Sequence, residues 1–70
     1  MKMPVASGND CLKVALKIGF EFKRQKGSHL ILTKGEKLLI IPLHKTLKKG
    51  TLHQILKTIE LTPEQFKELL

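Results

Sequence analysis

The sequence predicts an α+β fold, a two-layer sandwich in which a three-stranded antiparallel sheet carries helices on one face, with a short helix at the C-terminus. Three observations support this prediction. Apolar residues recur with a helical period near the N-terminus, three strand-like segments follow with tight turns between them, and two helix-entry signatures come last. Seventy residues suffice for one domain, so residues 1–70 are predicted to form a single domain.

The first helix is expected in "ASGNDCLKVALKIGF". Ser7 followed by Asp10 resembles a capping box, in which each side chain accepts a hydrogen bond from the other residue's backbone N–H. Gly19 can adopt a left-handed conformation and is a natural helix stop. The apolar stripe of this helix has the spacing i, i+3, i+4 and i+7 and consists of Cys11, Val14, Ala15 and Ile18.

Three strands are expected next. "FEFKRQ" alternates, with Phe20 and Phe22 on one side, and all three phenylalanines of the chain are expected in the core. "KGS" supplies a turn, "HLILT" a second strand, "KGEK" another turn and "LLIIPL" a third strand. Tight turns between consecutive strands predict an antiparallel meander. Pro42 has no N–H to donate and belongs at a strand end or a sheet edge.

Two more helices are expected after a basic loop, "HKTLKK". In "GTLHQILKTI", Thr51 is expected to be the N-cap, with Gln54 completing a capping box. In "LTPEQFKELL", Thr62 is expected to be the N-cap, with Pro63 at the first helical position and Gln65 at the third.

The net charge is the most informative feature of the composition. Thirteen Lys and Arg side chains against six Asp and Glu give +7, and the charge is unevenly distributed. Residues 1–57 carry +9 and residues 58–70 carry −2. A small basic body favours a polyanionic partner, most simply nucleic acid, through release of counterions. A lysine-rich surface that only confers solubility is the alternative.

Other functional classes find little support in the sequence. The single Cys11 cannot form an internal disulfide, and no Cys and His spacing is typical of a zinc site. No metal and no cofactor are therefore expected. No apolar run reaches the length of a membrane helix, and the N-terminus lacks the apolar core of a signal peptide. The expected location is the cytoplasm.

His29 is the first candidate for chemistry. Histidine side chains titrate near neutral pH and can exchange a proton with a ribose oxygen. RNA supplies its own nucleophile, the 2′-hydroxyl, so a positioned acid or base and charge stabilisation suffice for cleavage. Strand alternation places His29 on the side of Ile31 and Thr33, away from Leu30 and Leu32. The alternative is a polar residue that merely flanks a turn.

Basic residues near His29 and before the second expected helix form two candidate phosphate sites. Lys48 and Lys49 precede a helix start, where free N–H groups and the helix dipole attract anions. His44 and Lys45 lie at the other end of the same loop. A third basic group consists of Lys23, Arg24 and Lys26. These side chains could contact a nucleic-acid backbone, or they could prevent aggregation through an exposed strand edge. No exposed aromatic platform for base stacking is expected.

The ordered motifs of the chain resemble the HicA family of small bacterial toxins, also called YcfA-like proteins. They are "GF" at 19–20, "GSH" at 27–29, "PLH" at 42–44 and "KGTL" at 49–52 followed by "IL", and the resemblance extends from Ser7 to about Leu69. It implies a fold like the double-stranded-RNA-binding domain. It also implies an mRNA interferase, a ribosome-independent and metal-independent endoribonuclease that is neutralised by a HicB antitoxin covering its catalytic histidine.

The resemblance also assigns roles to residues. The catalytic histidine of G-[ST]-H corresponds to His29, which would act as general acid or base. Gly27 and Ser28 would shape the turn that presents it, and either a backbone N–H or the Ser28 hydroxyl would steady the phosphate. Lys45, Lys48, Lys49 and Thr51 correspond to the basic surface and are expected to contact RNA together with Lys26. The products expected from 2′-hydroxyl attack carry a cyclic phosphate.

Two functions from other classes stay open on the sequence. One is a non-catalytic double-stranded-RNA-binding module, which the charge and the element order suit equally well. The other is a protein-interaction module that uses a free sheet edge or face, which is compatible with a toxin that binds an antitoxin. The sequence does not specify the oligomeric state.

Overall fold

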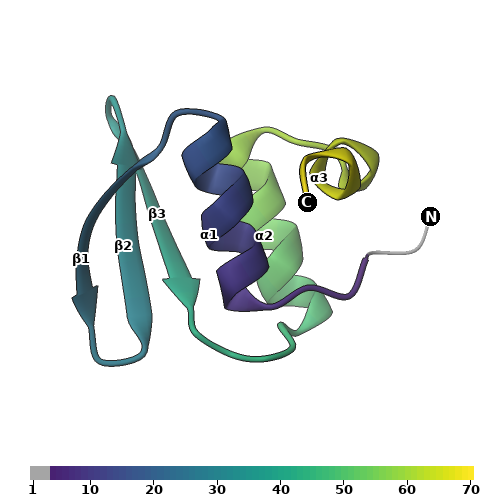
Figure 1. The fold of residues 1–70 in the computed structure, drawn as a ribbon, viewed down its shortest axis with the longest axis horizontal. Helices are drawn as coiled ribbons and strands as arrows, with labels where there is room; N and C mark the ends of the chain where they lie inside the picture. Colours follow the sequence, from purple (N-terminus) through teal and green to yellow (C-terminus); the bar gives the residue numbers. More distant parts are fainter. Residues whose placement is uncertain (1–3) are drawn as a thin grey trace.

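The computed structural model describes residues 4–70, and residues 1–3 of the expected domain lie outside the described part. The elements follow the predicted order, and the sheet order is β1-β2-β3 with both pairs antiparallel. In Figure 1, α1 lies in front of α2, both helices are next to β3, and β1 is the strand farthest from them. The predicted α+β class is confirmed. The elements are α1 Gly8–Lys17, β1 Glu21–Lys26, β2 His29–Lys34, β3 Lys37–Pro42, α2 Lys49–Ile59 and α3 Pro63–Leu69.

The predicted capping box at the start of α1 is confirmed. The Ser7 hydroxyl accepts a hydrogen bond from the Asp10 N–H, and the Asp10 carboxylate accepts one from the Ser7 N–H, both at 3.0 Å. The helix ends at Lys17, and Gly19 has a φ of 103°, which a residue without a side chain adopts at little cost. The capping box and Gly19 thus set where α1 begins and ends along the chain.

Both hairpins turn through two residues whose first member is a glycine. Gly27 joins β1 to β2 and Gly35 joins β2 to β3, each with a φ of 60°. Glycine with positive φ at this position is the pattern of a type II′ turn, whose twist matches that of the flanking strands. The predicted meander is confirmed, and in it the Cα of Lys26 pairs with that of His29.

The sheet has one covered face and one open face. Side chains that point toward the helices are buried, namely Leu30, Leu32, Leu39 and Ile41. Their neighbours along β2 and β3 point the other way, where no helix lies, and are exposed or half-buried. They are His29, Ile31, Thr33, Leu38, Ile40 and Pro42. Since Leu30 and Leu32 face the helices, the alternation of β2 puts His29 on the open face, as predicted.

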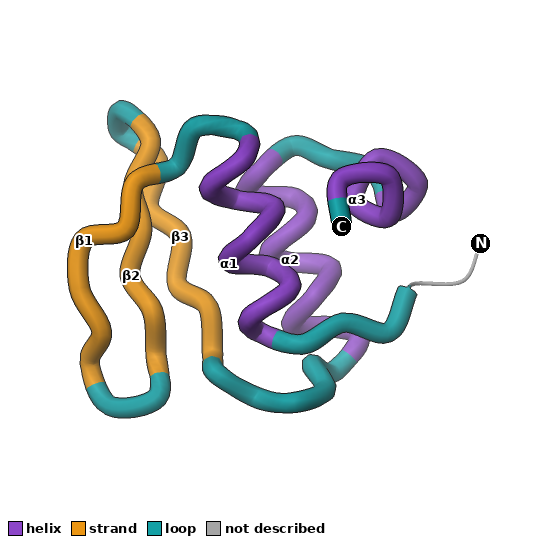
Figure 2. The backbone as a smooth tube through the Cα atoms, viewed as in Figure 1, coloured by secondary structure: helices purple, strands orange, loops and turns teal. Residues whose placement is uncertain are grey.

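The prediction that all three phenylalanines lie in the core is wrong for Phe22. Phe20 and Phe66 are buried, but Phe22 is 48% exposed. Phe22 pairs with Leu32 and therefore points to the helix side of the sheet. It stays exposed because β1 is the edge strand farthest from the helices, as the backbone trace in Figure 2 shows. A β-bulge between Phe22 and Arg24 then shifts the register of β1.

The predicted capping box of α2 is also wrong. The helix begins at Lys49, its N-cap is Lys48 with an extended backbone, and no side chain caps it. Leu47, just before it, is buried, and its N–H donates to the Ala6 carbonyl at 2.8 Å, which holds the chain at this point. Thr51 is thus already inside the first helical turn and cannot act as N-cap. The capping box predicted for α3, with Thr62 and Gln65, is confirmed.

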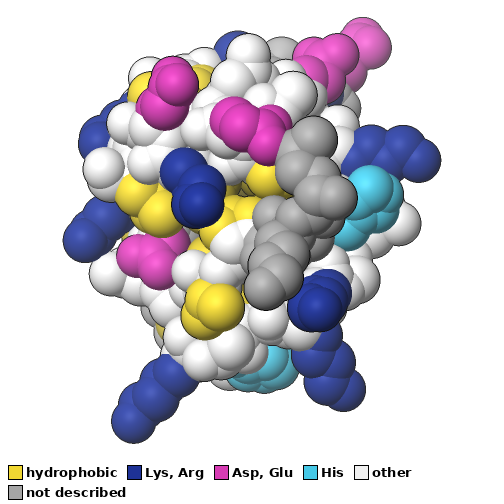
Figure 3. Space-filling view, turned by 90° about the vertical axis from the view of Figure 1, so that its right-hand side faces the viewer, with side chains coloured by type: hydrophobic (Ala, Val, Ile, Leu, Met, Phe, Trp, Pro, Cys, Tyr) yellow, Lys and Arg dark blue, Asp and Glu magenta, His cyan; other side chains and the backbone are white. Residues whose placement is uncertain are grey.

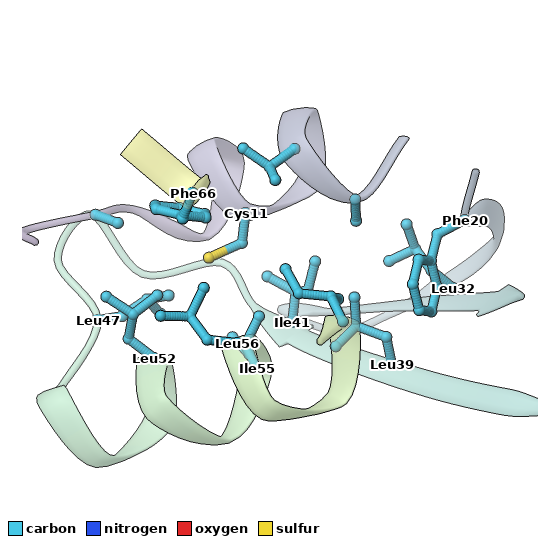
Figure 4. Packing of buried hydrophobic residues seen from close by; sticks show 14 of the residues in the cluster. Cys11, Phe20, Leu32, Leu39, Ile41, Leu47, Leu52, Ile55, Leu56 and Phe66 are labelled. Atoms are coloured by element: carbon cyan, nitrogen blue, oxygen red, sulfur yellow. The ribbon is translucent and has the colours of Figure 1, made fainter. Parts of the chain in front are cut away.

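A single apolar cluster joins the helices to the sheet (Figure 4). Phe66 of α3 lies close to Cys11 of α1, while Phe20, Leu32 and Leu39 pack at the sheet end of the cluster. Phe66 and Cys11 are both fully buried. Since α3 contributes Phe66 to this cluster, the third helix is part of the core that holds α1 in place.

Cys11 is expected to resist thiol reagents in the folded protein. Burial, with a smaller contribution from Asp10, raises the pKa of the Cys11 thiol to about 12. At pH 8 the reactive thiolate is then about 10³-fold scarcer than in an unfolded chain. Alkylation with iodoacetamide, followed by mass spectrometry with and without urea, measures this protection. Equal labelling rates in both conditions would contradict the buried position.

Glu60 is expected to titrate below the normal range of glutamate. It ends α2 in a left-handed conformation with a φ of 59°, and a hydrogen bond from Lys37, together with the Lys37 charge, lowers the pKa of its carboxyl. A lowered pKa in the folded state stabilises the fold above the unfolded pKa, and this stabilisation is lost as the pH falls through the folded value. The pKa of Glu60, measured by NMR, should rise toward its normal value in Lys37→Gln, while the Lys34 charge keeps a smaller lowering effect.

Candidate functional site

Four segments lie along one side of the molecule, the lower side in Figures 1 and 2. They are the β1–β2 turn, the loop between β3 and α2, and the N-terminal ends of α1 and α2. Backbone hydrogen bonds fasten the loop on both sides. The donors and acceptors are Leu43 N–H to the Ser28 carbonyl at 2.7 Å, Gly8 N–H to the His44 carbonyl at 2.9 Å, and the Leu47 to Ala6 bond already described.

His29 lies where the β1–β2 turn meets this loop. It is the first residue of β2, its Cα pairs with those of Lys26 on β1 and Pro42 on β3, and its side chain is exposed on the open face. An open hollow of about 530 Å³ lies beside it, lined by Lys26, Gly27, His29, Ile31 and Ile40. The imidazole and an ammonium group thus share one accessible concavity with two isoleucines.

A second hollow lies where the basic loop passes the start of α1. Its volume is about 330 Å³, and its lining includes His44 and Lys45 of the loop and Ser7 and Asn9 of α1. Lys45 is exposed, so its charge is accessible to a ligand on this side of the molecule.

The start of α2 carries two further predicted contacts. Lys48 and Lys49 are exposed, no acidic residue occurs in the first turn, and no side chain caps it. The first N–H groups of a helix have no intrahelical partners, so this end combines free donors, the positive end of the dipole and two lysines. Thr51 lies in a groove between β3 and α2 that Gln54 and Thr58 also line, and Ile40 lines both this groove and the hollow beside His29.

The acidic side chains are unevenly placed on the molecule. On the face drawn in Figure 3, Lys and Arg side chains occur throughout, acidic side chains lie in the upper and middle parts, and the charged side chains at the bottom are Lys or Arg, with His beside them. Three acidic residues, Glu60, Glu64 and Glu68, belong to the end of α2 and to α3, away from the start of α2, whereas Asp10 lies in the first turn of α1.

The fold therefore brings some predicted residues together and separates others. Lys26 and His29 line one hollow, and Ser28 forms the turn between them. Ile31 and Ile40 were not predicted for the site, although the two-residue turn at Gly35 would have paired them. No group of three or more His, Cys, Asp or Glu side chains that could hold a metal occurs within residues 4–70.

A comparison of the sequence with models of known protein families identifies the family of this chain. A family model described as "HicA toxin of bacterial toxin-antitoxin" matches residues 8–61, well over half of the chain. The chain belongs to the HicA toxin family. It is accordingly the toxin component of a toxin–antitoxin system, and an antitoxin is its expected partner. No curated protein matched the chain.

The match to the HicA toxins runs from the start of α1 to Leu61, two residues beyond the end of α2, and it contains His29 and all the predicted RNA contacts. Helix α3 lies outside it. In this HicA toxin, α3 is joined to α1 by Phe66 in the core and by a hydrogen bond from the Lys17 ammonium to the Leu69 carbonyl at 2.6 Å. In the described chain, no helix is long and apolar enough to cross a membrane.

Proposed function

We propose that this HicA toxin is a metal-independent endoribonuclease, an mRNA interferase, in which His29 is the catalytic acid or base. One observation carries the proposal: the exposed imidazole shares a hollow with the Lys26 ammonium. This arrangement supports the proposal because a proton-transfer group and a phosphate-binding charge in one hollow would act on the same stretch of RNA backbone. The proposed setting is the cytoplasm, where mRNA is the abundant substrate.

The proposed reaction uses the ribose as nucleophile. The 2′-hydroxyl oxygen attacks the adjacent phosphorus, its proton is removed, and the bond from phosphorus to the 5′-oxygen breaks while that oxygen gains a proton. The products are a 2′,3′-cyclic phosphate and a 5′-hydroxyl, so no water is consumed and the atoms balance. His29 serves one of the two proton transfers. Charge builds up on the non-bridging oxygens, where Lys26 and the Ser28 hydroxyl would stabilise it.

The other predicted residues would hold the flanking RNA. Lys45, in the hollow beside α1, and Lys48 and Lys49, at the start of α2, lie on the same side of the molecule as His29 and would bind phosphates on either side of the cut. Thr51 lies in the groove between β3 and α2 and would contact RNA there. A HicB-type antitoxin of acidic character would neutralise the toxin by covering the same basic residues.

Incubating the purified protein with a long mRNA in EDTA tests the proposal. We expect discrete fragments whose 3′ ends carry a 2′,3′-cyclic phosphate and whose 5′ ends carry a hydroxyl, as identified by mass spectrometry. Fragments that bear only 5′-phosphate and 3′-hydroxyl ends would exclude 2′-hydroxyl attack. Loss of cleavage in EDTA, with recovery on addition of Mg²⁺, would exclude the metal-independent reaction.

A non-catalytic double-stranded-RNA-binding module is the second candidate, favoured by the α-β-β-β-α order and the net positive charge. Such a module would bind RNA and cut none. The same incubation therefore separates the two functions, provided that RNA binding is measured beside cleavage by a gel-shift assay.

A further inference from the structure

The open face of the sheet places apolar and charged side chains in two parallel rows next to His29. Strand pairing aligns Arg24, Ile31 and Ile40 in one row across β1, β2 and β3, and Lys26, His29 and Pro42 in the next. The rows are two residues apart along each strand, about 7 Å. That spacing is on the scale of the separation between a nucleobase and its own phosphate.

Two isoleucines form the floor of the hollow beside His29. Ile31 and Ile40 are direct partners on neighbouring strands, and Ile40 is 49% exposed. Gly27 also lines the hollow and has no side chain that could fill it, and a Cβ built there meets nothing within 4 Å. The hollow of about 530 Å³ falls within the roughly 300–1,000 Å³ of small-ligand sites, and like them it has apolar walls and a few polar groups.

We propose that this hollow is a nucleobase subsite in which one base beside the scissile phosphate lies on Ile31 and Ile40. The proposal rests on the endoribonuclease function and adds a substrate class, namely RNA that is single-stranded at the cut. In an A-form duplex both faces of a base are stacked and its pairing edge is occupied, so only an unstacked base can lie on an apolar floor. The sugar and phosphate of that nucleotide then extend toward His29 and Lys26.

The charges around the floor favour a nucleotide over an apolar protein side chain. Arg24 and Lys26 flank the two isoleucines on β1, and both are exposed. A nucleotide can contact both the isoleucine floor and the cationic side chains. The faces of its base are flat and weakly polar, and its phosphate is anionic. A leucine or phenylalanine of a partner protein would satisfy only the isoleucine floor.

Two substrates and two variants test the subsite once the cut has been mapped. An RNA of about 20 nucleotides is compared single-stranded and annealed to its complement, and we expect the duplex to be cut at least about 100-fold more slowly. Ile40→Ala is expected to lower kcat/KM on the single strand about 10-fold, mainly through KM. Leu38→Ala is the matched control, because Leu38 lies on the same strand and face, is 57% exposed, and does not line the hollow.

An abasic ribonucleotide that keeps its 2′-hydroxyl provides the decisive comparison. The abasic nucleotide is placed first on one side of the cleavage site and then on the other. At one of the two positions it should slow cleavage by the wild type. With the abasic nucleotide at that position, Ile40→Ala should not lower the cleavage rate further. The subsite would be overturned if the rate losses caused by the abasic nucleotide and by Ile40→Ala multiplied at both positions. Equal cleavage rates for duplex and single-stranded RNA would also overturn it. So would an Ile40→Ala variant that cuts normally and loses only antitoxin binding.

Failure of the proposed function can be told apart from failure of the subsite. If the wild-type protein cuts no RNA, the endoribonuclease proposal is wrong, and binding judges the subsite by itself. Fluorescence anisotropy with 2′-O-methyl strands, with and without one base, then supplies the readout. Weaker binding of the abasic strand by the wild type but not by Ile40→Ala supports the subsite, and equal binding of both strands rejects it.

Discussion

His29→Ala is expected to lower the rate of RNA cleavage by about 10²–10⁴-fold, the range typical of removing a general acid or base. The imidazole is exposed on the open face and contributes nothing to the apolar cluster. Its removal should therefore leave the fold intact, since substitutions at such surface positions usually change stability by less than about 0.5 kcal/mol. Expression of the variant in bacteria should no longer inhibit growth.

His53→Ala is the matched control for this experiment. His53 is also an exposed histidine, but it lies on α2, in a hollow that Leu61 and Pro63 help to line, between α2 and the start of α3. Cleavage of a fluorescent RNA in EDTA should be unchanged in His53→Ala and lost in His29→Ala, while both variants keep the circular dichroism spectrum of the wild type. A His29→Ala variant that cuts within about threefold of the wild-type rate would remove the imidazole from the mechanism.

The position of His29 could be predicted because local signals agree there. The apolar pair Leu30 and Leu32 must face the helices, and the period of two in a strand then leaves His29 on the other side. Lys26 is expected in the turn "KGS", but it is the last residue of β1, because Gly27 and Ser28 alone form the turn. This two-residue turn sets Lys26 opposite His29. The same reasoning applied to Gly35 pairs Ile31 with Ile40, although the unbroken apolar run of β3 hides which of its residues are exposed.

Features that depend on distant packing could not be predicted. The exposure of Phe22 follows from how far the helices extend over the sheet, and the bulge after it breaks the alternation. The start of α2 is set by burial of Leu47 and its hydrogen bond to Ala6, residues more than forty positions apart, so the local capping signal at Thr51 was misleading. For the same reason, no local pattern predicted the close contact of Gly8 with β3.

Gly8→Ala is expected to destabilise the protein by about 3 kcal/mol or more, at the upper end of the range for overpacked positions. A Cβ at Gly8 would lie 2.1 Å from the Pro42 carbonyl oxygen and 3.0 Å from its carbonyl carbon. Both are backbone atoms, so no side chain can rotate away, and α1 or the end of β3 must shift. At about 4–8 °C per kcal/mol for a domain of this size, Tm should fall by more than about 10 °C.

Gly50→Ala is the matched control, because Gly50 lies in the first turn of α2 and a Cβ there meets nothing within 4 Å. Alanine at this position should stabilise the helix by up to about 1 kcal/mol. The contrast isolates the contact with Pro42 from any general effect of replacing glycine in a helix. Equal Tm values for the two variants would mean that α1 does not rest on the end of β3. Because Leu43, next to Pro42, bonds to Ser28, a shift there should also reduce RNA cleavage by molecules that remain folded.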